Sequence, residues 1–89
     1  MSTLKDLAIV ANVSAAVQVN SESCAIRVVT SASSTITVQR SIDGVNFTDI
    51  PDVSLVVNGT DEMNLNGIVK GQYLKVSSTA AMTSCKILF

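Results

Sequence analysis

The side chains that could do chemistry are few in this chain of 89 residues: seven carboxylates, two cysteines, one tyrosine and no histidine. Histidine is the commonest general base and a common metal ligand, so its absence leaves no Ser–His or Cys–His pair for nucleophilic catalysis. The cysteines do not form a Cys-x-x-Cys motif, and no glycine-rich loop precedes a helical pattern. We therefore expect no enzymatic activity and no cofactor.

The acidic residues are placed as turn residues rather than as metal ligands. Asp49 and Asp52 flank Pro51, and Asp61-Glu62 follows the turn signal Asn58-Gly59. A calcium site needs about six to eight oxygen atoms that converge on one point, and these acids lack the spacing of an EF-hand. We expect them to lie in turns and to hold no metal.

The two cysteines, Cys24 and Cys85, both fall on the inward-facing side of an alternating pattern. If their strands are neighbours, a disulfide is conceivable, but its geometry depends on the register of the strands. We expect synthesis in a cytoplasm, which favours two buried free thiols that pack as small apolar side chains.

These side chains have to be positioned by β-strands, because apolar and polar residues alternate with a period of two along the chain. Strands are expected within residues 13–19, 24–30, 35–42, 45–50, 53–57, 62–66, 71–77 and 85–89. Turn signals separate them at about 8–12 residues. The pattern predicts one all-β domain over residues 1–89, a small antiparallel β-sandwich of seven or eight short strands with jelly-roll or immunoglobulin-like architecture. Residues 1–11 are expected to form an N-terminal arm or an edge strand.

The centre of the pattern is a predicted hairpin over residues 35–50 that turns at Asp43-Gly44. Phe47 is expected to anchor the core, and Pro51 is expected to end the second strand because proline cannot donate to a central ladder. The buried face of the first strand is expected to carry Ile36, Val38 and Ile42.

Composition narrows the classes of partner. Charged residues make up 15% and the net charge is −1, with no basic stripe, so we expect no nucleic acid as a partner. No stretch reaches the roughly 20 apolar residues of a membrane span, so we expect no membrane association either. Aromatic residues are only 3%, so the core is expected to be thin and aliphatic. Such a domain gains stability by burying a face against another subunit, which favours a homo-oligomer.

The stretch Ser41-Ile42-Asp43-Gly44-Val45-Asn46-Phe47-Thr48-Asp49-Ile50 resembles a hairpin of small β-sandwich modules, among them structural and accessory proteins of tailed bacteriophages. In that group a later strand resembles Gly71-Gln72-Tyr73-Leu74-Lys75-Val76. The resemblance implies a non-enzymatic head decoration, head-fibre or tail-associated protein that is made in the host cytoplasm and resides in the virion. It further implies a homo-oligomer, such as a trimer, that contacts capsid or tail proteins.

A weaker resemblance connects the same hairpin with discoidin-like and carbohydrate-binding modules, although the aromatic platform of the sugar-binding members is missing. The alternative function is therefore a glycan-binding module that serves adhesion to a host surface. Protein contacts are expected at five positions: Leu4, Leu7, Ile9, Val29 and Tyr73. Glycan contacts are expected at Tyr73, Asn46, Asn58 and Asn66.

Overall fold

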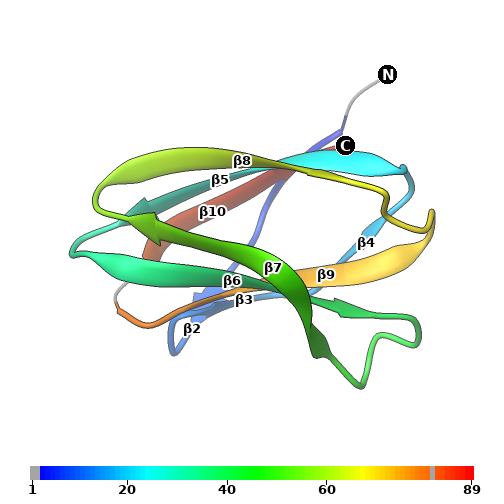
Figure 1. Ribbon diagram of the computed structural model, residues 1–89, viewed down its shortest axis with the longest axis horizontal. Coiled ribbons are helices and arrows are strands. Elements are labelled where there is room, and N and C mark those ends of the chain that lie inside the picture. The colour runs from blue at the N-terminus through cyan, green and yellow to red at the C-terminus, as the bar shows by residue number, and fades with distance from the viewer. Residues whose placement is uncertain (1–2, 81) are drawn as a thin grey trace.

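The computed structural model describes residues 3–80 and 82–89, which form an all-β domain of two antiparallel sheets packed as a sandwich (Figure 1). The strands in this part of the chain are β1 (Leu4–Asp6), β2 (Ile9–Val10), β3 (Val13–Ser14), β4 (Val17–Val19), β5 (Ser23–Thr30), β6 (Ser34–Ser41), β7 (Thr48–Val57), β8 (Thr60–Asn66), β9 (Gln72–Ser78) and β10 (Met82–Leu88).

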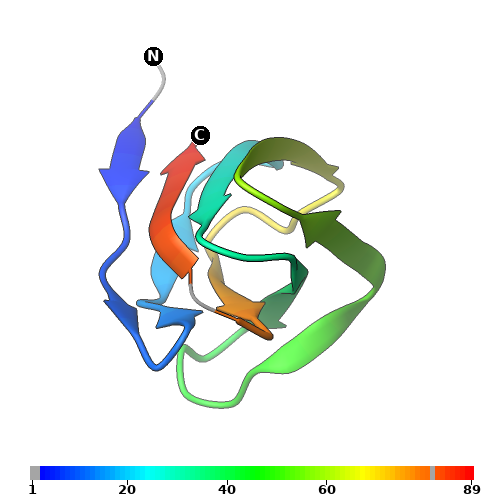
Figure 2. The ribbon, with the colours of Figure 1, turned by 90° about the vertical axis from the view of Figure 1, so that its left-hand side faces the viewer.

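One sheet has four strands in the order β1-β10-β5-β8, and the other has the order β2-β3-β9-β6-β7, with β4 also paired to β9. Figure 2 shows the two layers from the end of the sandwich. The expected strand over residues 13–19 is divided into β3 and β4, which pair with Ser77 and with residues 72–74 of the same strand β9. This division, together with the short strands β1 and β2, explains why more strands form than the alternation predicts.

The first half of the chain pairs antiparallel with the second half in a nested way. β6 pairs with β7, β5 with β8, β3 and β4 with β9, and β1 with β10. The two paired halves form one folded ribbon of chain, and the loop of residues 42–47 is the tip of this ribbon. The hairpin predicted from the sequence is therefore the point about which the remaining strands pair.

The core lies between the sheets and is aliphatic, as the composition predicts. In β5, and in β6 as far as Val38, alternate residues are buried, so each strand contributes one face to the core; at the end of β6 the alternation breaks, because Arg40 is exposed and Ser41 is buried. The largest fully buried side chains are Ile26, Ile36, Leu74, Ile87, Val19, Val28, Val38, Val57, Val76 and Cys85.

The turn of the hairpin is wider than Asp43-Gly44 alone, and two predictions for its side chains are wrong. β6 ends at Ser41, so Ile42 lies in the loop with 89% of its surface exposed. Phe47 is half-buried outside the core, and its ring lies 4.4 Å from Nζ of Lys75. The cause is a set of hydrogen bonds from backbone N–H groups of the loop to the side chains of Ser41 and Asp43, which compete with strand pairing.

Pro51 does not end the second strand, because β7 continues to Val57. The pairing of β6 with β7 shifts register here: Thr37 lies opposite Ser54, whereas Gln39 lies opposite Asp49. Pro51 thus falls in an irregular stretch of an edge strand, where its missing N–H leaves no ladder bond unmade.

Candidate interaction surfaces

Cys24 and Cys85 are buried free thiols on neighbouring strands. Cys85 lies opposite Val28, four positions along β5 from Cys24, so the two sulfur atoms are too far apart in register to bond. Burial raises the pKa of each thiol to about 11. The reactive thiolate is therefore suppressed at neutral pH, and both side chains act as core residues.

The prediction that the acids lie in turns is wrong for Asp49, which is in β7, and for Asp61 and Glu62, which are in β8. No group of three His, Cys, Asp or Glu residues gathers as a metal site in the described part of the chain. The carboxylate of Asp43 accepts hydrogen bonds from the backbone N–H groups of Val45 and Asn46, at 2.8 and 2.9 Å. These bonds, with those from the side chains of Ser41 and Asn46, hold the pKa of Asp43 well below its usual range. Asp49 accepts a bond from Gln39. The side chain of Asp52 lies outside the described structure.

The five residues expected at a protein interface are distributed over separate parts of the molecule. Leu4 is 61% exposed on β1, where it lies opposite Leu88. Leu7 and Ile9 are instead partly buried against the core. Val29 is half-buried on β5, on the face opposite to the core residues of that strand. The four residues therefore do not form one contiguous surface.

Tyr73, the fifth, lies on the outer face of the second sheet, as predicted from its parity with the buried Leu74 and Val76. Its ring covers Gly44, whose φ is +78°: a Cβ built there would lie 3.3 Å from ring carbons. The ring thus packs against the loop of residues 42–47 instead of standing free for a ligand.

The asparagines expected to contact a glycan lie at both ends of the sandwich. Asn46 is in the loop beside Tyr73, where its side chain donates to Asp43. Asn58 is in the β7–β8 turn, at the end where Gly59 accepts a hydrogen bond from Thr30. These residues cannot contact one small ligand together.

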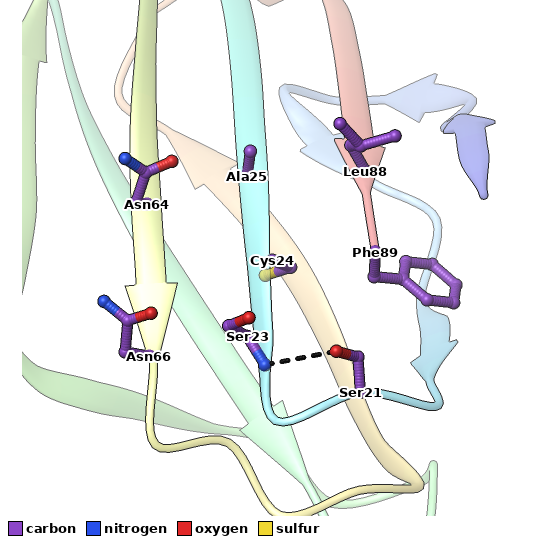
Figure 3. A pocket seen from close by; sticks show the side chains of 8 residues that line it. All are labelled: Ser21, Ser23, Cys24, Ala25, Asn64, Asn66, Leu88 and Phe89. Atoms are coloured by element: carbon purple, nitrogen blue, oxygen red, sulfur yellow. Dashed lines mark hydrogen bonds between the residues drawn. The ribbon is translucent and has the colours of Figure 1, made fainter. Parts of the chain in front are cut away.

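Asn66 lines a shallow depression of about 400 Å³ at one end of the four-stranded sheet. Figure 3 shows Asn64 and Asn66 in line on β8, with Ser23 and Ala25 beside them on β5. The ring of Phe89 points away from this row, so it provides no stacking platform for a sugar next to the amides.

Three strongly exposed apolar side chains lie on loops at one end of the sandwich, a surface that the alternation did not predict. Val10, 76% exposed on β2, lies at the other end, where its partner Val13 pairs with Ser77. Ile42 and Val45 on the 42–47 loop are 89% and 78% exposed, and Val69 on the β8–β9 loop is 71% exposed. Ile42 and Val69 line the same depression. We call these three residues the loop-tip patch. Its only sequence signal was that apolar residues stand beside the turn glycines Gly44, Gly67 and Gly71.

No helix long and apolar enough to cross a membrane occurs among the described residues. Comparison with protein-family models, with curated proteins and with solved structures finds no match to this chain.

Proposed function

We propose that this chain is a non-enzymatic structural or accessory subunit of a phage virion that acts through protein–protein contacts on a capsid or tail. The observation that carries the proposal is the loop-tip patch. Three branched aliphatic side chains, each more than two thirds exposed, lie on loops at one end of a small domain, and two of them, Ile42 and Val69, line the same depression. Exposed apolar groups that gather in this way are typical of an interaction site.

The strand order supports the proposal by analogy of fold. The nested pairing places β1-β10-β5-β8 in one layer and β2 to β4, β9, β6 and β7 in the other. Eight strand positions with this order are those of a jelly roll, which we propose as the architecture in preference to an immunoglobulin-like one. Jelly rolls occur in viral capsid proteins and also in lectins, so the analogy alone does not choose the function.

Two further observations favour protein contacts over the glycan-binding alternative. The residues expected to contact a glycan are divided between the two ends of the sandwich, and Tyr73 is engaged with Gly44. The loop-tip patch is apolar, and burying aliphatic side chains of its size against a second protein contributes about 1 kcal/mol or more for each residue.

The proposal can be tested by analysing the protein content of virus particles purified from the organism that encodes the chain. Quantitative mass spectrometry is expected to find the chain in many copies per particle, and its presence only in the particle-free fraction contradicts the proposal.

Particles that lack the chain allow a test of whether the loop-tip patch is the surface that binds them. Recombinant protein is expected to bind them, and the double variant Ile42→Ser/Val69→Ser is expected to bind at least tenfold more weakly. Val56→Ser is the matched control, because Val56 is 67% exposed on β7, away from the loop-tip patch. If both variants lose the same amount of binding affinity, the cause is a general effect of surface polarity and not the loop-tip patch.

A further inference from the structure

The strand edges of the sandwich differ in how well they are protected against pairing with another chain. In the described structure β1, β2 and β4 are edge strands of only two or three residues, and β7 carries Pro51 with a shift of register. Short strands, proline and irregular pairing are devices that prevent edge-to-edge association. β8 has none of these three: it is seven residues long and contains no proline, lysine or arginine, and its charged residues are the acids Asp61 and Glu62. All seven residues stay in unbroken register with β5.

The backbone of β8 presents a regular row of hydrogen-bonding groups to this open edge. The N–H of Thr30 donates to the carbonyl of Gly59 at 2.7 Å, which marks Thr30 and Gly59 as a hydrogen-bonded pair. Because such pairs alternate along an antiparallel ladder, the odd-numbered residues of β8 bond to β5. The even-numbered residues, Thr60, Glu62, Asn64 and Asn66, therefore direct their N–H and C=O groups outward.

The N–H of Glu62 shows the same orientation independently. It donates to the carboxylate of Asp61 at 2.8 Å, a local bond that covers one outward-facing donor. The side chains of Asn64 and Asn66 have no hydrogen-bond partner among the described residues. The edge is thus regular and pairs with no other strand of the described chain, and the one outward N–H that is bonded, that of Glu62, has to exchange the Asp61 carboxylate for another acceptor when a strand pairs here.

We propose that β8 is a self-association edge at which two copies of the chain pair antiparallel about a two-fold axis through Met63. The two four-stranded sheets then join into one continuous sheet of eight strands. This inference rests on the proposed function in treating the chain as an assembly subunit, and it names a second copy as the partner at this edge.

The side chains of β8 select this register. With the axis at Met63, Glu62 of each copy lies opposite Asn64 of the other, so the amide can donate to the carboxylate twice in the dimer. Thr60 lies opposite Asn66 in the same way, and all seven residues of β8 are paired. An axis at Glu62 would place two carboxylates directly opposite each other, and an axis at Asn64 would leave Thr60 unpaired.

Two unfavourable contacts remain: Asp61 of each copy lies opposite the apolar Leu65 of the other, and the two Glu62 carboxylates approach each other, which is partly offset. The two Glu62 carboxylates are diagonal neighbours across the axis, on the outer face of the joined sheet. Each of them lies in register with Arg27 on β5 of its own copy. The guanidinium therefore reduces the repulsion between the two acids.

Sedimentation equilibrium over a series of protein concentrations tests the proposal. The mass is expected to rise from 9.3 kDa toward twice that value as the concentration increases. Asn64→Pro removes an outward N–H that no β5 residue uses, so it is expected to keep the protein monomeric. Asn64→Ala keeps that N–H and is the matched control, which should still dimerise. A circular dichroism spectrum of each variant confirms that the β-fold is retained.

Variants that change the charge at exposed positions of β8 test the register between the two copies, even if the proline substitution disturbs the strand. Asn64→Glu places an acid opposite Glu62 and is expected to raise the dimer Kd about tenfold, whereas Asn64→Lys is expected to lower it. The double variant Glu62→Lys/Asn64→Glu exchanges the two signs and is expected to restore dimerisation lost in Asn64→Glu.

Three results would overturn the self-association edge: a monomer at every concentration, a trimer, or a dimer whose Kd none of these substitutions changes. Each leaves the binding of the protein to particles unaffected, so failure here is distinguishable from failure of the proposed function.

Discussion

The 42–47 loop is held by hydrogen bonds to the Ser41 hydroxyl and to the Asp43 carboxylate, and the carboxylate is the group that titrates. Asp43 accepts hydrogen bonds from two backbone N–H groups of the loop and from the side chains of Ser41 and Asn46. These bonds favour the charged form and lower the pKa of Asp43 in the folded state. Its contribution to stability is therefore complete above the pKa of an unfolded aspartate, about 3.9, and is lost only as the pH falls through the lower folded value.

We predict that Asp43→Ala loosens this loop without unfolding the domain. Hydrogen exchange of the Val45 and Asn46 amides is expected to accelerate severalfold at neutral pH, because both lose their acceptor. The amide of Gly44, which donates to Ser41, is the internal reference. Unchanged exchange at Val45 and Asn46 would show that the carboxylate does not hold the loop.

Residue parity predicted the buried side chains well inside strands and poorly at their ends. Leu74 and Tyr73 lie on the inner and outer faces as the alternation indicated. Ile42 has the parity of the buried residues Ile36 and Val38 of β6. It is exposed nevertheless, because side-chain hydrogen bonds end the strand one residue earlier. A period of two reports which side of a strand a residue faces, but it does not report where loop hydrogen bonds replace the ladder.

At the scale of single elements, the N-terminal segment shows how burial changes within a few residues. Leu4 lies on the exposed face of β1, whereas Leu7 packs against the core after the chain leaves this strand. The apolar run predicted contacts for both residues but could not distinguish a contact with another subunit from one with the core. That difference depends on how β1 pairs with β10, which is far away in the sequence.

We predict that Leu7→Ala lowers the free energy of unfolding by about 1–2 kcal/mol, because it removes apolar area packed on the core. Leu4→Ala is the matched control and is expected to change it by about 0.5 kcal/mol or less. Urea denaturation monitored by circular dichroism measures both. A larger effect for Leu4 than for Leu7 would contradict the placement of β1 as an exposed edge strand.

At the scale of the whole molecule, the nested pairing implies an order of folding. β6 and β7 are joined by a loop of only six residues, 42–47, whereas β10 pairs with β1 and β5, which lie far away along the chain. Closing a short loop costs less conformational entropy than closing a long one. Pairing of β6 with β7 is therefore the natural nucleus, and each outer pair of the ribbon closes a loop that the inner pairs have already shortened.

Two chemically identical substitutions at opposite ends of the ribbon test this order. Ile36 on β6 and Ile87 on β10 are both almost completely buried, so Ile36→Val and Ile87→Val should each lower the stability by about 1 kcal/mol. Stopped-flow kinetics in urea separates their effects on the two rates. Ile36→Val is expected mainly to slow folding, whereas Ile87→Val is expected mainly to accelerate unfolding. If both substitutions slow folding equally, β10 is already in place at the transition state, and the ribbon does not close from its tip.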